Sequence, residues 1–365
     1  MFIHNDNEWP AFRWDTAALA EPLATTRHRQ GLLVGRLSAL GLRLQQEAEL
    51  TALTNEIVRS SAIEGERLPP DEVRSSIARR LGLTAGGVIE SSRAVEGVVE
   101  MMIDATQRYD EPLTVDRLFG WHSALFPSGR SGMRAISAGQ WRDDRSGPMQ
   151  VISGAMGSER VHYEAPAAER VETEMQRFLM WLNTEDGTDP VLRAGVAHLW
   201  FVTIHPFDDG NGRITRAIAE LMLARSDART ERFYSMSAQI DEERRDYYTR
   251  LEHAQRGGLD ITSWLDWFLG CLARSFEKAE LALDAVFRKA RMWERANANG
   301  VNDRQRLVLT RLLDEWQGNL TSTKYATIAK CSPDTALRDI ALLIDSGVLE
   351  KNEGGGRSAS YRLAE

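Results

Sequence analysis

Cysteine is scarce in this chain, which has two, Cys271 and Cys331, at distant positions. Two cysteines are too few for a disulfide framework, and the sequence contains no Cys-x-x-Cys pair and no Cys/His cluster with zinc spacing. These absences exclude a disulfide-stapled secreted module and a zinc-finger type of fold. We expect both thiols to behave as small apolar side chains in a reducing compartment, by default the cytoplasm.

Long apolar runs and an excess of basic charge are also lacking. The sequence has no apolar stretch long enough to span a membrane, and its start, MFIHNDNEWPAFRWD, has no charged segment followed by an apolar one. We therefore expect no membrane partner and no signal peptide. The net charge is −8 and the pI about 5.6, so the chain as a whole lacks the basic character typical of nucleic-acid binding.

Most of the sequence shows a helical pattern of apolar residues. The 365 residues, 42% hydrophobic and 27% charged, suffice for two or three globular domains. Apolar residues recur at three- and four-residue spacing in 16–64, where two helices are expected, and again in 71–127 and 168–295. The region between the last two is rich in Gly and Ser, with β-prone residues near Val151 and Val161, and predicts a loop and a β-hairpin. The expected fold class is mainly α.

The last sixty or so residues follow a separate plan, after the polar stretch ANANGVNDR. Three helices are expected at 304–316, 322–330 and 333–346, followed by two short strands around a Gly-rich loop that carries Arg357. This layout is typical of a winged helix-turn-helix. However, residues 301–365 hold nine Lys/Arg and nine Asp/Glu (9 − 9 = 0), and DNA phosphates favour a positive surface. DNA is therefore a possible but not a favoured partner of this module, and protein docking is favoured.

The stretch TIHPFDDGNGRITRAI concentrates groups that suit phosphate chemistry. Flexible glycines directly precede a helix, whose first N–H groups are unpaired and favour an anion. Arg213 and Arg216 lie on one face of the first turn and can donate to phosphate. Asp209 offers hard oxygen ligands for Mg²⁺, and His205 is the one side chain here that ordinarily titrates near neutrality. The alternative is a plain helix–turn–helix with a surface histidine and a capping aspartate.

This stretch resembles a known family. HPFDDGNGRITR matches the Fic signature His-Pro-Phe-x-Asp/Glu-Gly-Asn-Gly-Arg-x-x-Arg at every fixed position. AGQWR, residues 138–142, is similar to the family's Gly-x-x-Arg segment, and the hairpin near 149–163 lies where Fic proteins have a target-docking flap. The resemblance covers roughly 90–290. It implies a Fic helical core with a β-hairpin flap, an N-terminal helical module and a C-terminal winged helix, at 89–296, 1–88 and 301–365.

The resemblance implies protein adenylylation, in which AMP passes from ATP to a Ser, Thr or Tyr hydroxyl of a target protein and pyrophosphate leaves. His205 would be the general base, and Asp209 would bind Mg²⁺. An anion nest and two phosphate-binding arginines would complete the loop: Gly210, Asn211, Gly212, Arg213 and Arg216. The kinase-like Doc branch has Lys where this chain has Gly212, which favours AMP transfer here.

The helix RRDYYTRLEHAQRG resembles the adenine-side helix of Fic proteins. Tyr248, Leu251 and Gln255 would line the adenine pocket. The family often has Asn where this chain has Gln255, and an ordinary amphipathic helix with a stacked Tyr is the alternative.

The segment SSAIEGE resembles the inhibitory motif Ser/Thr-x-x-x-Glu-Gly/Asn of Fic proteins with their own N-terminal helix. Ser60, Glu64 and Gly65 occupy its fixed positions. Glu64 would pair with Arg216, and an arginine held by a carboxylate cannot clamp a phosphate. The alternative is a solvent-exposed glutamate before a helix-ending glycine.

Three other functions remain open from the sequence. Glu64 could orient water for the reverse reaction, de-AMPylation. The same loop could transfer a different nucleotide or phosphocholine, or the chain could be a DNA-binding regulator that acts through its winged helix. The expected partners are ATP, a target protein on the flap near 149–163, and a second copy in a homodimer.

Overall fold

The computed structural model describes residues 2–83, 89–145, 147–153, 160–314, 318–352 and 359–364. The chain forms two compact units, Met1–Ala279 and Glu280–Glu365. Within the described ranges, no helix is both long and apolar enough to cross a membrane. The mainly helical fold class that the sequence predicts is confirmed.

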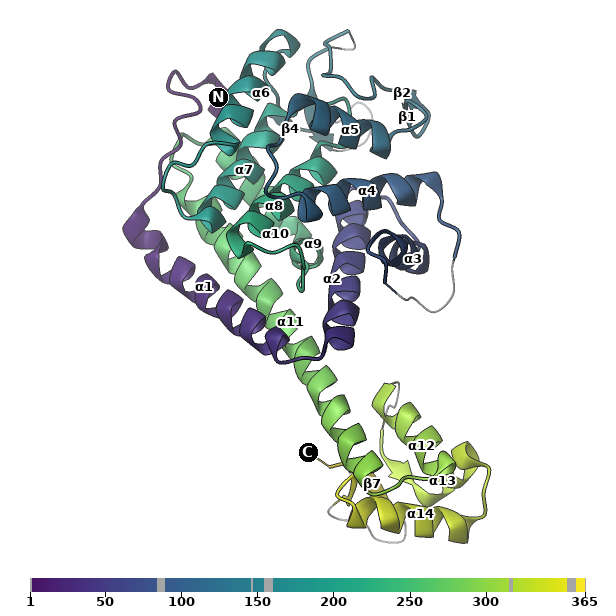
Figure 1. The fold of residues 1–365 in the computed structure, drawn as a ribbon. Helices are drawn as coiled ribbons and strands as arrows, with labels where there is room; N and C mark the ends of the chain where they lie inside the picture. The colour runs from purple at the N-terminus through teal and green to yellow at the C-terminus, as the bar shows by residue number, and fades with distance from the viewer. Residues whose placement is uncertain are drawn as a thin grey trace. The chain divides into compact units, whose positions relative to one another are not determined.

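Two buried helices form the centre of the first unit. α7 (Pro190–Ile204) and α8 (Asn211–Asp227) lie side by side (Figure 1) and pack along each other. α7 is apolar around nearly its whole circumference, as expected for a helix surrounded by others, and almost all its residues are buried. Only six residues connect the two helices, so the end of α7 and the start of α8 are held close together.

Nine further helices surround this pair or lead away from it within the described residues. Their bounds are α1 (Thr16–Ser38), α2 (Leu42–Ile63), α3 (Pro70–Arg80), α4 (Arg93–Gln107), α5 (Val115–Leu125), α6 (Ala168–Leu182), α9 (Met236–Glu242), α10 (Arg244–Arg256) and α11 (Thr262–Ala298). α2 packs on α3 and α9, whereas α4 packs on α5 and α8. Side chains of Asp15, Ser92 and Thr114 cap α1, α4 and α5 by accepting from N–H groups of the first turn.

The strands of the first unit are short. β3 (Gln150–Ser153) and β4 (Arg160–Glu164) pair antiparallel, with Val151 opposite Tyr163, which confirms the predicted hairpin. Residues 154–159 of the predicted flap lie outside the described residues. A second pair, β1 (Arg130–Ser131) and β2 (Arg134–Ala135), was not anticipated from the sequence.

The N-terminal segment packs across the helices of the first unit. After a 3-10 turn, η1 (Ile3–Asn5), the indole N–H of Trp9 donates to Glu174 of α6 at 2.9 Å. Trp9 and Phe12 also make edge-to-face ring contacts with Trp200 of α7. The aromatic residues near the N-terminus thus attach the N-terminal module to the central helices.

The second unit combines three helices with a three-stranded sheet. In chain order it contains α12 (Asp303–Asp314), β5 (Leu320–Thr321), α13 (Ser322–Ala329), α14 (Pro333–Asp345), β6 (Leu349–Lys351) and β7 (Ser360–Leu363), with strand order β5-β7-β6. Its assignment to the winged-helix class stays a prediction, and Arg357 lies outside the described residues. The unit begins before the expected linker at 296–304, because Met292 and Ala296 of α11 belong to its hydrophobic core.

Gly97 of α4 lies where α4 and α5 approach each other closely, so a substitution at Gly97 tests this helix contact. A β-carbon on Gly97 would lie 1.8 Å from the carbonyl oxygen of Ala124, whereas one on Gly120 of α5 would meet nothing within 4 Å. We expect Gly97→Ala to destabilise the protein by about 1–3 kcal/mol through overpacking. Gly120→Ala, the matched control, should stabilise it by about 0.5–1 kcal/mol. Urea unfolding of both variants checks this, and equal stabilities would contradict the close helix contact.

Candidate active site

The loop between α7 and α8 is bounded by two residues in the left-handed conformation. His205 ends α7 with φ 52°, and its N–H donates to the carbonyl of Phe201 at 3.0 Å. Gly210 precedes α8 with φ 79°, and a β-carbon there would lie 2.8 Å from the Phe126 ring. A non-glycine residue at positive φ is strained, and such strain concentrates at functional sites. The surrounding structure must therefore hold His205 in place.

Two side chains brace this loop from within. The side-chain amide of Asn211 accepts from the N–H of Phe207 at 3.0 Å and donates to its carbonyl at 2.8 Å. The buried Arg142 guanidinium donates to the carbonyl of His205 at 2.8 Å, and the Arg142 N–H donates to the Pro206 carbonyl at 3.0 Å. The Phe207 ring itself is fully buried. The loop is therefore preorganised by its own residues and by Arg142.

The His205 imidazole is oriented by one hydrogen bond. Its Nδ1 lies 3.2 Å from the carbonyl of Val202, so Nδ1 is the protonated nitrogen and Nε2 keeps its lone pair. Burial lowers the pKa of His205 from 6.5 to about 4. The ring is therefore neutral at physiological pH and can accept a proton at Nε2.

Asp209 presents a carboxylate on the same loop. The hydroxyl of Ser131 donates to one of its oxygens, and the N–H of Gly210 donates to the other at 2.5 Å. No group of three or more His, Cys, Asp or Glu side chains suited to a metal occurs among the described residues. Mg²⁺ is often held by one or two protein carboxylates together with substrate phosphates, so a single oriented carboxylate fits this ion.

His122 of α5 positions the Asp209 backbone. Gly139 N–H donates to His122 Nδ1 at 3.0 Å, which leaves Nε2 to donate to the Asp209 carbonyl at 3.2 Å. The ring stacks on Phe207 with 4.2 Å between centroids, and burial lowers the pKa of His122 to about 4. The sequence alone does not identify His122, because one histidine in an amphipathic helix gives no local signal of its partner.

Arg216 is held by the last turn of α2. Its Nε donates to the Ser60 hydroxyl at 2.8 Å and its Nη2 to the Ser60 carbonyl at 2.7 Å. Its Nη1 lies 2.9 Å from Oε1 of Glu64 in an ion pair, and the Arg216 side chain is only 2% exposed. Burial opposes the charge, but the Glu64 carboxylate raises the pKa of Arg216 above its usual value. The C-terminal end of α2 and α8 therefore meet at one buried guanidinium.

The Glu64 carboxylate also lies against the first turn of α8. A β-carbon on Gly212 would be 2.0 Å from Glu64 Oε1, so only glycine leaves room for the carboxylate there. The N-terminus of a helix favours negative charge. Glu64 thus occupies a place where an anion would be stabilised, beside an arginine that could bind it.

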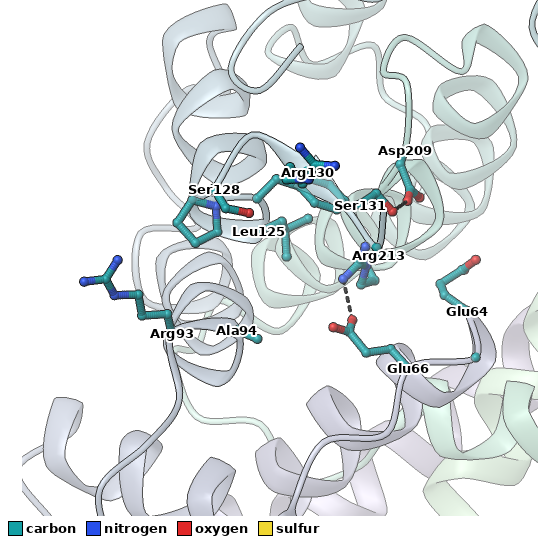
Figure 2. A pocket seen from close by; sticks show the side chains of 14 residues that line it. Glu64, Glu66, Arg93, Ala94, Leu125, Ser128, Arg130, Ser131, Asp209 and Arg213 are labelled. Carbon is teal, nitrogen blue, oxygen red and sulfur yellow. Dashed lines mark hydrogen bonds and ion pairs between the residues drawn. The ribbon is translucent and has the colours of Figure 1, made fainter. Parts of the chain in front are cut away.

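The second arginine of the loop faces a cavity next to Glu64. Arg213 Nη1 lies 2.6 Å from Oε2 of Glu66. Arg213, Asp209, Glu64 and Glu66 line a cavity of about 630 Å³ (Figure 2). Glu66 is not among the residues predicted from the sequence. Its position two residues beyond Glu64, directly after Gly65, is the one sequence feature that could have indicated a contact with the same loop.

The three residues expected around adenine lie on α10, outside this cavity. The Tyr248 hydroxyl is 3.4 Å from the Ile63 carbonyl, close to Glu64, and Tyr248 is 39% exposed. Leu251 and Gln255 are buried, and the Gln255 amide donates to the Thr203 hydroxyl at 3.4 Å. Their contact with adenine stays a prediction.

The flap strand β4 is attached to α10 by side chains. Arg256 donates to the carbonyls of Val161 and His162 at 2.6 and 3.0 Å, and Glu252 pairs with Arg160 at 2.8 Å. Val151 and Ile152 of β3 are exposed.

The structure brings most of the expected site residues together around one loop. These residues are Ser60, Glu64, Gly65, His205, Asp209, Gly210, Asn211, Gly212, Arg213 and Arg216.

The neutral His205 imidazole, the Asp209 carboxylate and the buried guanidiniums lie together at the N-terminus of α8, where an anion such as phosphate would be stabilised. Residues 112–223, which include α7 and the loop, match the Fic/DOC family, so this part of the chain is a Fic domain, as the motif predicted. Residues 2–83, which carry Glu64, match a domain of unknown function, DUF4172.

Curated relatives share the family. The protein adenylyltransferase Fic of Nematostella vectensis is 24% identical over 235 residues, which cover 63% of this chain and 49% of the relative. The protein of the same name from Drosophila yakuba is 25% identical and is covered over 43% of its length. The chain thus spans less than half the length of these two relatives.

Solved structures share the fold. A Fic family protein from Desulfovibrio desulfuricans G20 superposes with a TM-score of 0.54 at 22% identity, over 96% of this chain and 97% of that one. Fic-1 from C. elegans gives a TM-score of 0.50 at 21% identity, over 74% of this chain and 75% of that one. The Fic fold is therefore shown by structure as well as by sequence.

The lowered pKa of His205 predicts an unusual titration. Because the folded pKa is about 4, the His205 ring should stay neutral from about pH 8 down to about pH 5. In ¹³C-histidine NMR, the signal that disappears in His205→Ala should not shift across this range. In urea-unfolded protein the histidines should titrate near about 6.5. A midpoint near 6.5 for His205 in the folded protein would contradict the lowered pKa of its ring.

Proposed function

We propose that this protein transfers AMP from ATP to a Ser, Thr or Tyr hydroxyl of a target protein, and that Glu64 inhibits the transfer. The observation that carries the proposal is the loop 205–216. There a neutral His205 with a free Nε2 lies beside a helix N-terminus that carries Asp209, Arg213 and Arg216. The names of the curated relatives and the family match at 112–223 support the same activity.

The reaction requires one proton transfer and one bond exchange at phosphorus. His205 Nε2 would accept the proton of the target hydroxyl as its oxygen attacks the α-phosphorus of ATP. The bond from this phosphorus to the oxygen that bridges to the β-phosphate breaks, and pyrophosphate leaves. Arg213 and Arg216 would neutralise the negative charge of the leaving phosphates. The first turn of α8 would add its unpaired N–H groups.

Asp209 would hold Mg²⁺ on this loop. The ion would supply positive charge that neutralises the phosphates of ATP. Ser131 and the Gly210 N–H already orient the Asp209 carboxylate, and His122 fixes its backbone, so the ligand is positioned before substrate arrives.

Inhibition would follow from the ion pair between Glu64 and Arg216. The Arg216 guanidinium is already engaged with both oxygen atoms of Ser60 and is ion-paired with Glu64, so a phosphate would have to compete with these partners. Glu64 also lies against Gly212, where an anion would bind. ATP would then bind poorly or with its α-phosphate out of line.

The target would dock on the flap. Val151 and Ile152 are exposed on the short strand β3, whose partner β4 is fastened to α10. An added strand would pair through backbone hydrogen bonds, with little demand on the target sequence. The target is therefore defined by an extended segment with a hydroxyl side chain.

The DNA-binding alternative finds little support in the second unit. The exposed residues of α14 include Asp334, Arg338 and Asp345, a net negative set, whereas phosphate contacts need positive charge. Asp339 is buried and engaged with Arg304 at 2.9 Å.

De-AMPylation, the reverse reaction, would use the same loop. Incubation with a target protein that already carries AMP distinguishes it from the forward reaction.

The function is tested by the intact mass of the protein after incubation with Mg²⁺ and α-labelled ATP. We expect Glu64→Gly to acquire AMP about tenfold faster than wild type or more, because a charge-assisted contact that blocks Arg216 is lost. Adding His205→Ala to this variant should lower the rate by about 10²–10⁴-fold.

Folding of every variant is verified by thermal unfolding. Label that persists undiminished in Glu64→Gly/His205→Ala would refute His205 as the base. Transfer from γ-labelled instead of α-labelled ATP would replace AMP transfer with phosphorylation, and equal rates for wild type and Glu64→Gly would refute the brake.

A further inference from the structure

A second ion pair joins the inhibitory segment to the loop. Arg213 Nη1 and Glu66 Oε2 are 2.6 Å apart, and the side chains of Arg213 and Glu66 are 7% and 39% exposed. Glu66 lies outside the Ser-x-x-x-Glu-Gly pattern of residues 60–65. Each of the two arginines at the start of α8 therefore has its own carboxylate partner, because Glu64 pairs with Arg216.

The end of α2 explains why two carboxylates two positions apart can reach the same helix. Gly65 takes φ 85°, and the N–H groups of Gly65 and Glu66 donate to the carbonyls of Ala62 and Ser61 at 2.9 and 3.0 Å. This glycine-based C-cap turns the chain sharply. In Figure 2, Glu64 and Glu66 come from this one turn, and Glu66 points to Arg213.

The surroundings of Arg213 suit the binding of an anion. Its guanidinium carbon lies 5.1 Å above the Phe126 ring, which fixes the side chain. Its Nε is buried and has no hydrogen-bond partner among the described residues. Arg213 lines the 630 Å³ cavity together with Asp209, the carboxylate that would hold Mg²⁺. A buried donor without a partner is costly, and an anion in this cavity would supply one.

We propose that Glu66 is a second inhibitory residue, which masks Arg213 from the β- and γ-phosphates of ATP independently of Glu64. The inference rests on the proposed function, since it takes a nucleoside triphosphate as the ligand. Removal of Glu64 alone would free Arg216 and leave Arg213 engaged. Full affinity for the polyphosphate then requires that both carboxylates withdraw, and one movement of the α2 turn would withdraw both.

The effect of Glu66 on nucleotide affinity should therefore depend on the β- and γ-phosphates, which ATP has and AMP lacks. AMP has no group for Arg213 once its α-phosphate lies near His205, whereas ATP presents two further phosphates. Loss of Glu66 should therefore tighten ATP and leave AMP unchanged. A residue that merely supports the fold would alter both ligands together.

The test is isothermal titration of ATP and of AMP, with Mg²⁺, into wild type, Glu66→Gln, Glu64→Gly and the double variant. Because Glu66 is partly exposed, we expect Glu66→Gln to bind ATP about two- to fivefold more tightly than wild type. The double variant should bind ATP more tightly than either single variant, because the carboxylates act on different arginines. Glu47→Gln is the matched control: this glutamate of α2 pairs with Arg74 at 2.7 Å.

Arg213→Ala supplies the decisive background. There Glu66→Gln should no longer change the affinity for ATP, whereas Glu64→Gly should still raise it. If Glu66→Gln binds ATP as wild type does while Glu64→Gly binds it more tightly, the inference about Glu66 fails and the proposed function stands. If no variant binds ATP although all unfold cooperatively, both are overturned.

Discussion

The buried guanidinium of Arg216 connects the end of α2 to the start of α8. Its side chain is 2% exposed and engages Ser60 and Glu64, the residues of the proposed inhibitory motif. A buried charge that loses its partner destabilises a protein by several kcal/mol, so Arg216 must always face an anion or strong acceptors. In the structure that anion is Glu64, and in the proposed reaction it is a phosphate of ATP. If Glu64 and a phosphate of ATP compete for Arg216, as we propose, inhibition and substrate binding exclude each other.

The rest of the loop is held by contacts that do not involve Glu64. Asn211 closes the turn on Phe207, Arg142 holds the carbonyl of His205, and His122 holds that of Asp209. These contacts come from α8 itself, from α5 and from the segment after β2. Preorganised groups of this kind stabilise charge in a transition state without further rearrangement. In the proposed inhibition, Glu64 therefore blocks access to Arg216 and does not displace His205, the proposed base.

Local patterns predicted much of this molecule. The 3.6-residue periodicity indicated α1, α2 and the later helices, and the string from His205 to Arg216 identified the Fic domain that the family match confirms. Contacts between distant segments were not predictable from local pattern. Helix packing determines which groups His122 and Glu66 contact. It also brings the Gln255 amide to the Thr203 hydroxyl, with which it forms a hydrogen bond. The unit boundary within α11 likewise depends on the packing of Met292 and Ala296.

The most direct test of the account is a crystal structure of Glu64→Gly with a non-hydrolysable ATP analogue and Mg²⁺. It should show the Arg216 guanidinium on the β- or γ-phosphate, with the analogue's α-phosphate within reach of His205 Nε2. An analogue bound elsewhere, with Arg216 still on Ser60 alone, would contradict the claim that Glu64 and phosphate compete for one guanidinium.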